Sequence, residues 1–316
     1  MRISTTVGLE LDGPQTIDQI VDEVRHAAQL GLAGAWWAQL FNWDALTALT
    51  VAGRAVPDLP LGTAVVTTYP RHPLALASQA LSVQAAIGNR LTLGIGPSHK
   101  RFVEPMLGFS FERPALHTRE YLTALGPLLR GESVDFDGEI HHVAGQIAVA
   151  GAAPPRVLLA ALGPVMLRIA GELTDGTVTT WTGVRTIADH IVPTITAAAD
   201  AGGQPAPEVV TSLPVAVTDD APAARAWVGE RFGLANDTPS YRAMLDREGL
   251  DTVDQLVIAG DEDAVEEQLR RFADVGATEL IAVPFGDPAQ VARTLDLLGA
   301  LATSSALSTA GASRTS

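Results

Sequence analysis

The chain of 316 residues contains no cysteine. This absence excludes disulfide bonds, thiolate nucleophiles, and zinc or iron–sulfur centres held by cysteine. Basic residues are also scarce, 21 against 36 acidic residues, and the net charge of −15 opposes attraction to nucleic acid or to an anionic membrane surface. We therefore expect a small-molecule substrate, with no nucleic-acid partner and no membrane partner.

Long apolar runs and common catalytic motifs are missing as well. No apolar run spans a membrane and the first residues show no signal-peptide pattern, so we expect a cytoplasmic protein. The HExxH, EF-hand, P-loop and GxSxG patterns do not occur, and the sequence predicts no metal site. His141 and His142 have no acidic residue at metal-site spacing, and we expect both on the surface. Arg119 and Glu120 are expected on a solvated helix face or at a partner contact.

The apolar pattern that is present predicts eight strands alternating with helices. The predicted strands are residues 2–8, 34–40, 61–67, 91–95, 156–161, 176–181, 208–217 and 279–283. This alternation favours an α/β fold, a closed (β/α)8 TIM barrel, as a single domain over residues 1–302. We expect residues 303–316, which are small and polar, to form a disordered tail.

Three segments interrupt the regular alternation. Residues 133–143 alternate around Asp137-Gly138, which predicts a hairpin insertion beside the barrel. Residues 97–111 are long for a connection between strand and helix, and loops of that length tend to carry function. Residues 219–254, after the seventh strand, hold poorly ordered helical patterns, with a mobile portion expected at 235–240.

Residues 155–183 predict a strand, a tight turn, a helix and a second strand. Gly163 allows the backbone to approach a ligand, and Pro164 suits the first turn of a helix, whose free amides would face an anion. An ordinary turn between strand and helix also favours glycine and proline. From this turn alone, both interpretations stay open.

Loops after the carboxyl ends of barrel strands carry the chemistry of this fold. His99 follows the fourth predicted strand, where it could transfer a proton near neutral pH or simply be a solvated histidine. Trp43 follows the second strand and could wall a planar ligand. Gly94-Ile95-Gly96 lacks the third glycine of a dinucleotide-binding turn, so its small residues more plausibly admit a flat ring.

Together these stretches resemble the luciferase-like flavin and deazaflavin oxidoreductases. The resemblance is carried by LGTAVVT at 61–67, PLALASQ at 73–79 and NRLTLGIG at 89–96. RPALHTREYL from Arg113 and the stretch from Pro155 are similar to the branch that uses coenzyme F420 and includes methylene-tetrahydromethanopterin reductases. The resemblance implies a (β/α)8 barrel, usually a homodimer, and hydride transfer at C5 of F420, with FMN as the alternative cofactor.

The resemblance also assigns residues to the cofactor. It places a non-prolyl cis peptide at Ala64-Val65, under the middle of the deazaflavin. Trp43 matches an aromatic residue over the active face. Further cofactor contacts would come from Thr67, from Gly96, Pro97 and Ser98 beside the ring and ribityl chain, from Ala160, Ala161, Leu162 and Gly163 at the phosphate, and from Trp181, Thr182 and Gly183 beside it.

Two departures from the family pattern bear on the reaction. Gln39 stands where sugar-oxidising members carry a histidine base, and His99 stands where they carry an acidic residue. Both argue against a sugar-phosphate alcohol dehydrogenase and leave room for reduction of a C=C or C=N bond in a small or medium organic substrate. His99, Gln39 and Trp43 are the catalytic candidates.

Two alternatives stay open. The first is an FMN-dependent luciferase-like monooxygenase or reductase. The second is a non-catalytic F420- or flavin-binding protein, which the glutamine at position 39 favours slightly.

Overall fold

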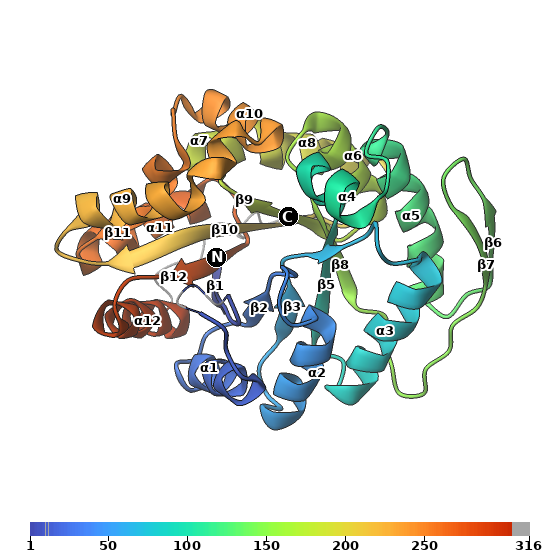
Figure 1. The fold of residues 1–316 in the computed structure, drawn as a ribbon, viewed down its shortest axis with the longest axis horizontal. Helices are drawn as coiled ribbons and strands as arrows, with labels where there is room; N and C mark the ends of the chain where they lie inside the picture. Colours follow the sequence, from blue (N-terminus) through green and yellow to red (C-terminus); the bar gives the residue numbers. More distant parts are fainter. Residues whose placement is uncertain (10, 12, 305–316) are drawn as a thin grey trace, which may run out of the picture.

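The computed structural model describes residues 1–9, 11 and 13–304, and eight of the strands form a closed parallel barrel (Figure 1). The barrel strands are β1 (Arg2–Thr6), β2 (Ala35–Trp37), β3 (Leu61–Thr63) with its continuation β4 (Val66–Thr67), β5 (Leu91–Gly96), β8 (Arg156–Ala160), β9 (Gly176–Thr180), β10 (Glu208–Val217) and β12 (Glu279–Pro284). They pair in this order, and β12 closes the circle by pairing with both β10 and β1. The predicted (β/α)8 barrel is confirmed; the predicted tail lies, from residue 305 onward, outside the described residues.

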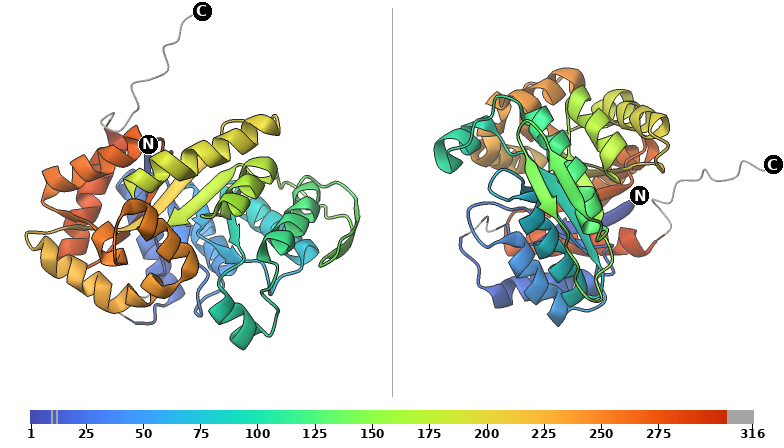
Figure 2. Two further views of the ribbon diagram at one scale, coloured as in Figure 1. Left: turned by 90° about the horizontal axis from the view of Figure 1, so that it is seen from above. Right: turned by 90° about the vertical axis from the view of Figure 1, so that its right-hand side faces the viewer.

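Helices surround the barrel (Figure 2). The outer helices are α1 (Ile17–Gln29), α2 (Ala45–Ala55), α3 (Pro73–Ala86), α5 (Pro114–Leu129), α6 (Pro164–Leu173), α8 (Val192–Ala201), α11 (Glu262–Asp274) and α12 (Pro288–Thr303). Helix α1 begins with a capping box of Thr16 and Gln19, and α12 with one of Asp287 and Gln290. In the part of the chain that the structure describes, no helix combines the length and the apolar character that crossing a membrane requires.

Shorter helices lie in the connections that follow strand ends. They are α4 (Lys100–Leu107) after β5, α7 (Val184–Thr186) and the π-helical turn η1 (Ile187–Ile191) between β9 and α8, and α9 (Ala221–Phe232), η2 (Gly233–Asp237), α10 (Pro239–Glu248) and η3 (Val253–Leu256) after β10. The expectation of poor helical order in residues 219–254 is therefore wrong. Asp220 caps α9, and Ala235 and Leu245 are buried, so packing fixes a segment whose own periodicity is weak.

A further strand, β11 (Ile258–Gly260), pairs with the end of β10 outside the closed circle. The sequence does not predict this strand, because three residues are too few to show the alternation of apolar and polar side chains that marks a strand.

The third barrel strand is interrupted at the expected cis peptide. The bond between Ala64 and Val65 is cis, and it separates β3 from β4. Thr63 Oγ1 donates to the Gly94 carbonyl at 2.7 Å, and the Ala64 amide donates to the Trp37 carbonyl at 2.8 Å. Both neighbouring strands therefore hold the interruption in place.

The predicted hairpin consists of β6 (Val134–Asp137) and β7 (His142–Gly145), and it lies beside α5, away from the barrel (Figure 2). Its turn spans four residues, since Asp137 pairs with His142.

Glu120 of α5 closes this turn. Its carboxylate accepts the backbone amides of Glu139, Ile140 and His141 at 2.8–3.0 Å. Glu120 is only 7% exposed, so its expected place on a solvated face or partner contact is wrong. The expected surface position of His141 is wrong too, because its ring is half-buried and bonded to His117, whereas His142 is exposed.

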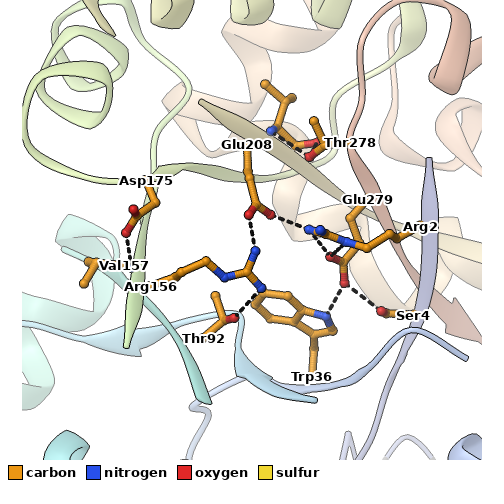
Figure 3. Close-up of polar contacts among 11 residues, drawn as sticks. Arg2, Ser4, Trp36, Thr92, Arg156, Val157, Asp175, Glu208, Thr278 and Glu279 are labelled. Atoms are coloured by element: carbon orange, nitrogen blue, oxygen red, sulfur yellow. Dashed lines mark hydrogen bonds and ion pairs between the residues drawn. The ribbon is translucent and has the colours of Figure 1, made fainter. Parts of the chain in front are cut away.

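Charged side chains gather at the amino ends of the strands (Figure 3). Glu279 accepts hydrogen bonds from Ser4 Oγ at 2.6 Å, Trp36 Nε1 at 2.8 Å and Arg2 Nε at 2.9 Å. Glu208 forms ion pairs with both Arg2 and Arg156. Each glutamate has guanidinium partners, so this end of the barrel is closed by a charge-balanced network.

We expect Glu279→Gln to lower the free energy of unfolding by about 1–3 kcal/mol, because a neutral side chain weakens the charge-assisted hydrogen bonds that the buried carboxylate accepts. Arg2 keeps its ion pair with Glu208 in this variant. Glu172→Ala is a matched control, since Glu172 pairs with Arg119 between two partly exposed helix faces and such pairs contribute at most about 1 kcal/mol. Urea unfolding of both variants measures the difference. Equal losses would show that the network adds nothing beyond a surface ion pair.

Candidate active site

The predicted site residues lie together at the carboxyl ends of five strands that are neighbours in the barrel: β2, β3 with β4, β5, β8 and β9. Gln39 and Trp43 follow β2; Ala64, Val65 and Thr67 lie in the interrupted strand; Gly96, Pro97, Ser98 and His99 end and follow β5; Ala160, Ala161, Leu162 and Gly163 end and follow β8; Trp181, Thr182 and Gly183 follow β9. The structure therefore gathers the whole predicted set on one face.

Packing explains the small residues at the end of β5. A Cβ atom on Gly94 would lie 1.9 Å from the Thr63 carbonyl oxygen. One on Gly96 would lie 2.9 Å from Ala160 Cβ and 3.0 Å from Val65 Cγ2. Neighbouring strands already fill this space, so both glycines are required by the barrel itself, whether or not a flat ring lies above them.

Two turns of the site adopt backbone conformations that side chains disfavour. Ser98 has φ of 63° and Trp181 has φ of 52°; of the described non-glycine residues, only Asn89, in a turn before β5, shares a positive φ. Such conformations persist where surrounding contacts fix them, and they are concentrated at ligand sites. Trp181 is buried and packs against Phe232, which holds its turn.

The turn before α6 leaves open space beside the amino-terminal amides of the helix, as an anion-binding turn does. Gly163 is the N-cap of α6, and no side chain caps this helix. A Cβ atom on Gly163 would meet no described protein atom within 4 Å, and its φ of −78° suits any residue. His190 of η1 donates to the Leu162 carbonyl at 2.8 Å and so orients the turn from below. The residues present therefore fit an anionic group.

The turn after β9 is different, although its sequence is similarly small. Glu248 of α10 accepts the Arg185 amide at 3.0 Å, and the amide and hydroxyl of Thr186 at 2.8 and 2.7 Å. A Cβ atom on Gly183 would lie 2.3 Å from the Glu248 carboxyl carbon. An internal carboxylate therefore already binds the amides next to the predicted contacts Thr182 and Gly183.

The side chains of Gln39 and Trp43 form hydrogen bonds that stabilise the loop between β2 and α2. Gln39 Oε1 accepts the Ala45 amide at 2.9 Å, and its amide nitrogen donates to the carbonyls of Leu40 and Trp43 at 3.2 and 3.4 Å. Trp43 Nε1 donates to the Gln15 carbonyl at 3.0 Å, and the ring is 39% exposed. The Gln39 side chain is thus occupied in holding the loop, while Trp43 keeps an exposed surface.

His99 lies at the start of α4 with its ring half-buried. Its Nε2 is 3.1 Å from the hydroxyl oxygen of Tyr241, which comes from α10. Burial, assisted by the positive charge of Arg101, lowers the pKa of His99. The imidazole is therefore neutral at physiological pH and has a fixed polar partner.

A second histidine is buried beside the site. His117 Nε2 bonds Thr68 Oγ1 at 3.0 Å and its Nδ1 bonds His141 Nε2 at 3.1 Å, while Tyr69 stacks on its ring at 3.9 Å between centroids. Burial, assisted by His141, lowers the pKa of His117 to about 4. The pair links the end of β4 to the hairpin.

Tyr241, Glu248 and His117 are not predicted from the sequence. Tyr241 and Glu248 lie seven residues apart, near the two ends of α10, in the segment whose helical pattern is weak. His117 lies in RPALHTREYL, but nothing in that stretch shows that its ring reaches Thr68. Each acts through contacts that only the folded chain creates.

An eight-stranded parallel barrel with its candidate residues at the carboxyl face defines the class: a (β/α)8 barrel of the luciferase-like fold. The model of the luciferase-like monooxygenase family matches residues 1–279, and the chain belongs to this family. It is accordingly a flavin- or deazaflavin-type oxidoreductase.

Known proteins resemble this chain, in sequence or in fold, over most of its length. A 5,10-methylenetetrahydromethanopterin reductase of Methanolobus tindarius is 26% identical over 306 residues, covering 88% of this chain and 93% of that protein. An F420-dependent secondary alcohol dehydrogenase bound to an F420–acetone adduct superposes with a TM-score of 0.80 at 16% identity, covering 95% and 97% of the two chains. The oxygenating constituent of 3,6-diketocamphane monooxygenase from Pseudomonas putida, with FMN, gives 0.75 at 16% identity and the same coverage.

Acid should destabilise this protein through His117. Its pKa is about 4 when folded and 6.5 for the free side chain, so between these values the unfolded chain binds more protons. The stabilisation is complete above pH 6.5 and is lost, by about 2–3 kcal/mol, as the pH falls toward 4. Urea unfolding from pH 7.5 to 4 measures this slope.

The matched variants are His117→Gln and His26→Gln. The first should make the slope clearly shallower, with a remainder from other histidines whose pKa burial lowers, such as His99 and His190. The second removes an exposed histidine of α1 and serves as the control for the substitution. A slope that persists undiminished in His117→Gln would assign the acid sensitivity to other groups.

Proposed function

We propose that this protein is an F420-dependent oxidoreductase that transfers hydride between C5 of the deazaflavin and a small or medium organic substrate. The observation that carries the proposal is the uncapped, open turn at Gly163, which follows β8 and is separated from the Ala64-Val65 backbone by the single strand β5. When bound, F420 would supply the hydride. The proposal includes a homodimer, from the family resemblance, and the cytoplasmic location expected from the sequence pattern.

The amino-terminal ends of α6 and α7 suggest where the phosphate of the cofactor would bind. Among the described residues, no side chain fills the Gly163 turn, while the amides of Arg185 and Thr186 are bound to Glu248. Repulsion between a phosphate and this carboxylate disfavours the second position. We therefore assign the phosphate to Ala160, Ala161, Leu162 and Gly163.

The site favours reduction over alcohol oxidation. Gln39 cannot accept a proton, and its amide is committed to the loop of Trp43. His99 has its own polar partner, and exposed apolar side chains such as Phe41, in contact with Phe102, lie near its ring. These surroundings suit an uncharged acceptor with a C=C or C=N bond, with His99 as proton donor.

FMN is the second candidate cofactor, because its tail also ends in a phosphate that the Gly163 turn could hold. Anaerobic titration distinguishes the two: F420 should bind saturably and FMN much more weakly. Binding of FMN without F420 would instead support a flavin-dependent monooxygenase or reductase. F420 binding without hydride transfer to any of a broad panel of acceptors would support a non-catalytic binding protein.

We expect Gly163→Val to weaken F420 binding by about tenfold or more. The new side chain enters space that no described residue occupies, at a φ that valine readily adopts, so the fold should be unaffected. Equilibrium titration gives the affinity, and thermal unfolding serves as the control. Unchanged affinity would exclude this turn as the phosphate site.

His99→Ala should lower kcat by about 100-fold while changing F420 affinity little, because a proton donor acts in the transition state. Steady-state kinetics with an accepted substrate, together with F420 titration, separate the two effects. Equal losses of turnover and affinity would indicate a structural role.

A further inference from the structure

The Tyr241 hydroxyl is held against the His99 ring. Its oxygen lies 3.1 Å from Nε2, and the two rings pack edge to face, with centroids 5.1 Å apart and planes at 68°. Phe102 packs against another edge of the imidazole at 6.3 Å and 62°. The orientation of the His99 ring is therefore fixed by two aromatic neighbours and one hydrogen bond.

The helix that carries Tyr241 is anchored at its far end. Glu248, at the end of α10, accepts three hydrogen bonds from Arg185 and Thr186. At the near end, the Tyr241 amide donates to the Thr238 carbonyl at 2.9 Å. These contacts hold the backbone that carries Tyr241 in place at the barrel face.

The direction of the hydrogen bond follows from the acceptor that the Tyr241 hydroxyl can reach. Burial raises the pKa of Tyr241 to about 12, so the phenol keeps its proton, and burial keeps the His99 ring neutral. Within the described residues, Nε2 is the acceptor that the Tyr241 hydroxyl reaches, and Nδ1 of His99 makes no hydrogen bond. A neutral imidazole that accepts at Nε2 carries its proton on Nδ1.

We propose that Tyr241 is a positioning residue that holds His99 in its Nδ1–H tautomer, so that the ring presents a hydrogen-bond donor to the substrate. The proposal rests on the proposed function and narrows its substrate class. A donor suits an imine or an α,β-unsaturated carbonyl compound, whose nitrogen or oxygen gains negative charge as hydride reaches carbon. Oxidation of an alcohol would require an acceptor at this position instead.

The proton balance of the reduction is complete. The C=N or C=C bond gains hydride at carbon from reduced F420, which is oxidised. The proton on His99 Nδ1 passes to the substrate nitrogen or, for the unsaturated carbonyl, to the enolate. As Nδ1 gives up its proton, Nε2 takes the Tyr241 hydroxyl proton. After product release the proton on Nε2 returns to the phenolate while solvent protonates Nδ1, so each hydride is matched by one proton from solvent and the Nδ1–H tautomer is restored.

The first test needs neither cofactor nor substrate. In apoprotein labelled with ¹⁵N-histidine, with His99 signals assigned from a His99→Asn variant, Nδ1 should be protonated and Nε2 unprotonated at pH 7.5. Tyr241→Phe keeps the ring packing and should shift His99 toward the Nε2–H form. Protonated Nε2 in the wild-type protein would overturn the tautomer assignment, whatever the activity.

The second test measures turnover. Tyr241→Phe should lower kcat for imine or enone reduction by about tenfold or more, with the F420 dissociation constant changed less than twofold. Tyr69→Phe is the matched control, since Tyr69 stacks on His117 and does not touch His99, and it should leave kcat unchanged.

The outcomes separate the two proposals. Normal turnover in Tyr241→Phe, despite a shifted tautomer and intact F420 binding, would overturn the role of Tyr241. Failure of the wild-type protein to bind F420, with Nδ1 protonated, would overturn the proposed cofactor while supporting the tautomer assignment.

Discussion

The buried carboxylate of Glu279 is the interaction on which the barrel interior depends. It joins Arg2 and Ser4 of β1 to Trp36 of β2 and belongs itself to β12, so one side chain fixes three adjacent strands at their amino ends (Figure 3). Glu208 extends the network to Arg156 on β8. The charges are balanced at this amino-terminal end, whereas the candidate site lies at the opposite end of the barrel, where Arg71 forms an ion pair with Asp44 at 2.6 Å.

Trp36 connects the glutamate network at the amino ends of the strands to the interior of the barrel. Its indole nitrogen binds Glu279, while its ring packs in the barrel interior with Leu158, Val178, Val210 and Ile281. Ala64, Val65 and Ala160, the proposed cofactor contacts, rest on that cluster. Because protein interiors are closely packed, the position of these three residues is set by the side chains inside the barrel and not by the surrounding loops.

Sequence patterns predicted the barrel because strand and helix periods are local and repeat eight times. They also located the residues at the strand ends, since the fold alone brings those ends together. They failed where a contact joins distant parts of the chain: Glu120 binds a hairpin 19–21 residues away, and Tyr241 reaches His99 across 142 residues. The apolar residues of α10 show only a weak helical periodicity for the same reason. This helix is held by individual contacts with distant segments and does not bury one broad apolar face.

The turns after β8 and β9 show why a local pattern cannot decide between a ligand site and a structural turn. Both place a glycine at the N-cap of a helix, so in neither is the helix capped by an N-cap side chain. One receives a carboxylate from Glu248, more than 60 residues later in the chain, and the other receives no side chain. Since Glu248 and Tyr241 belong to the same helix, the cap that fills one turn also sets the polar partner of His99. The proposed phosphate site at Gly163 therefore rests on a comparison of the two turns, because the structure fills one with a carboxylate and leaves open space at the other.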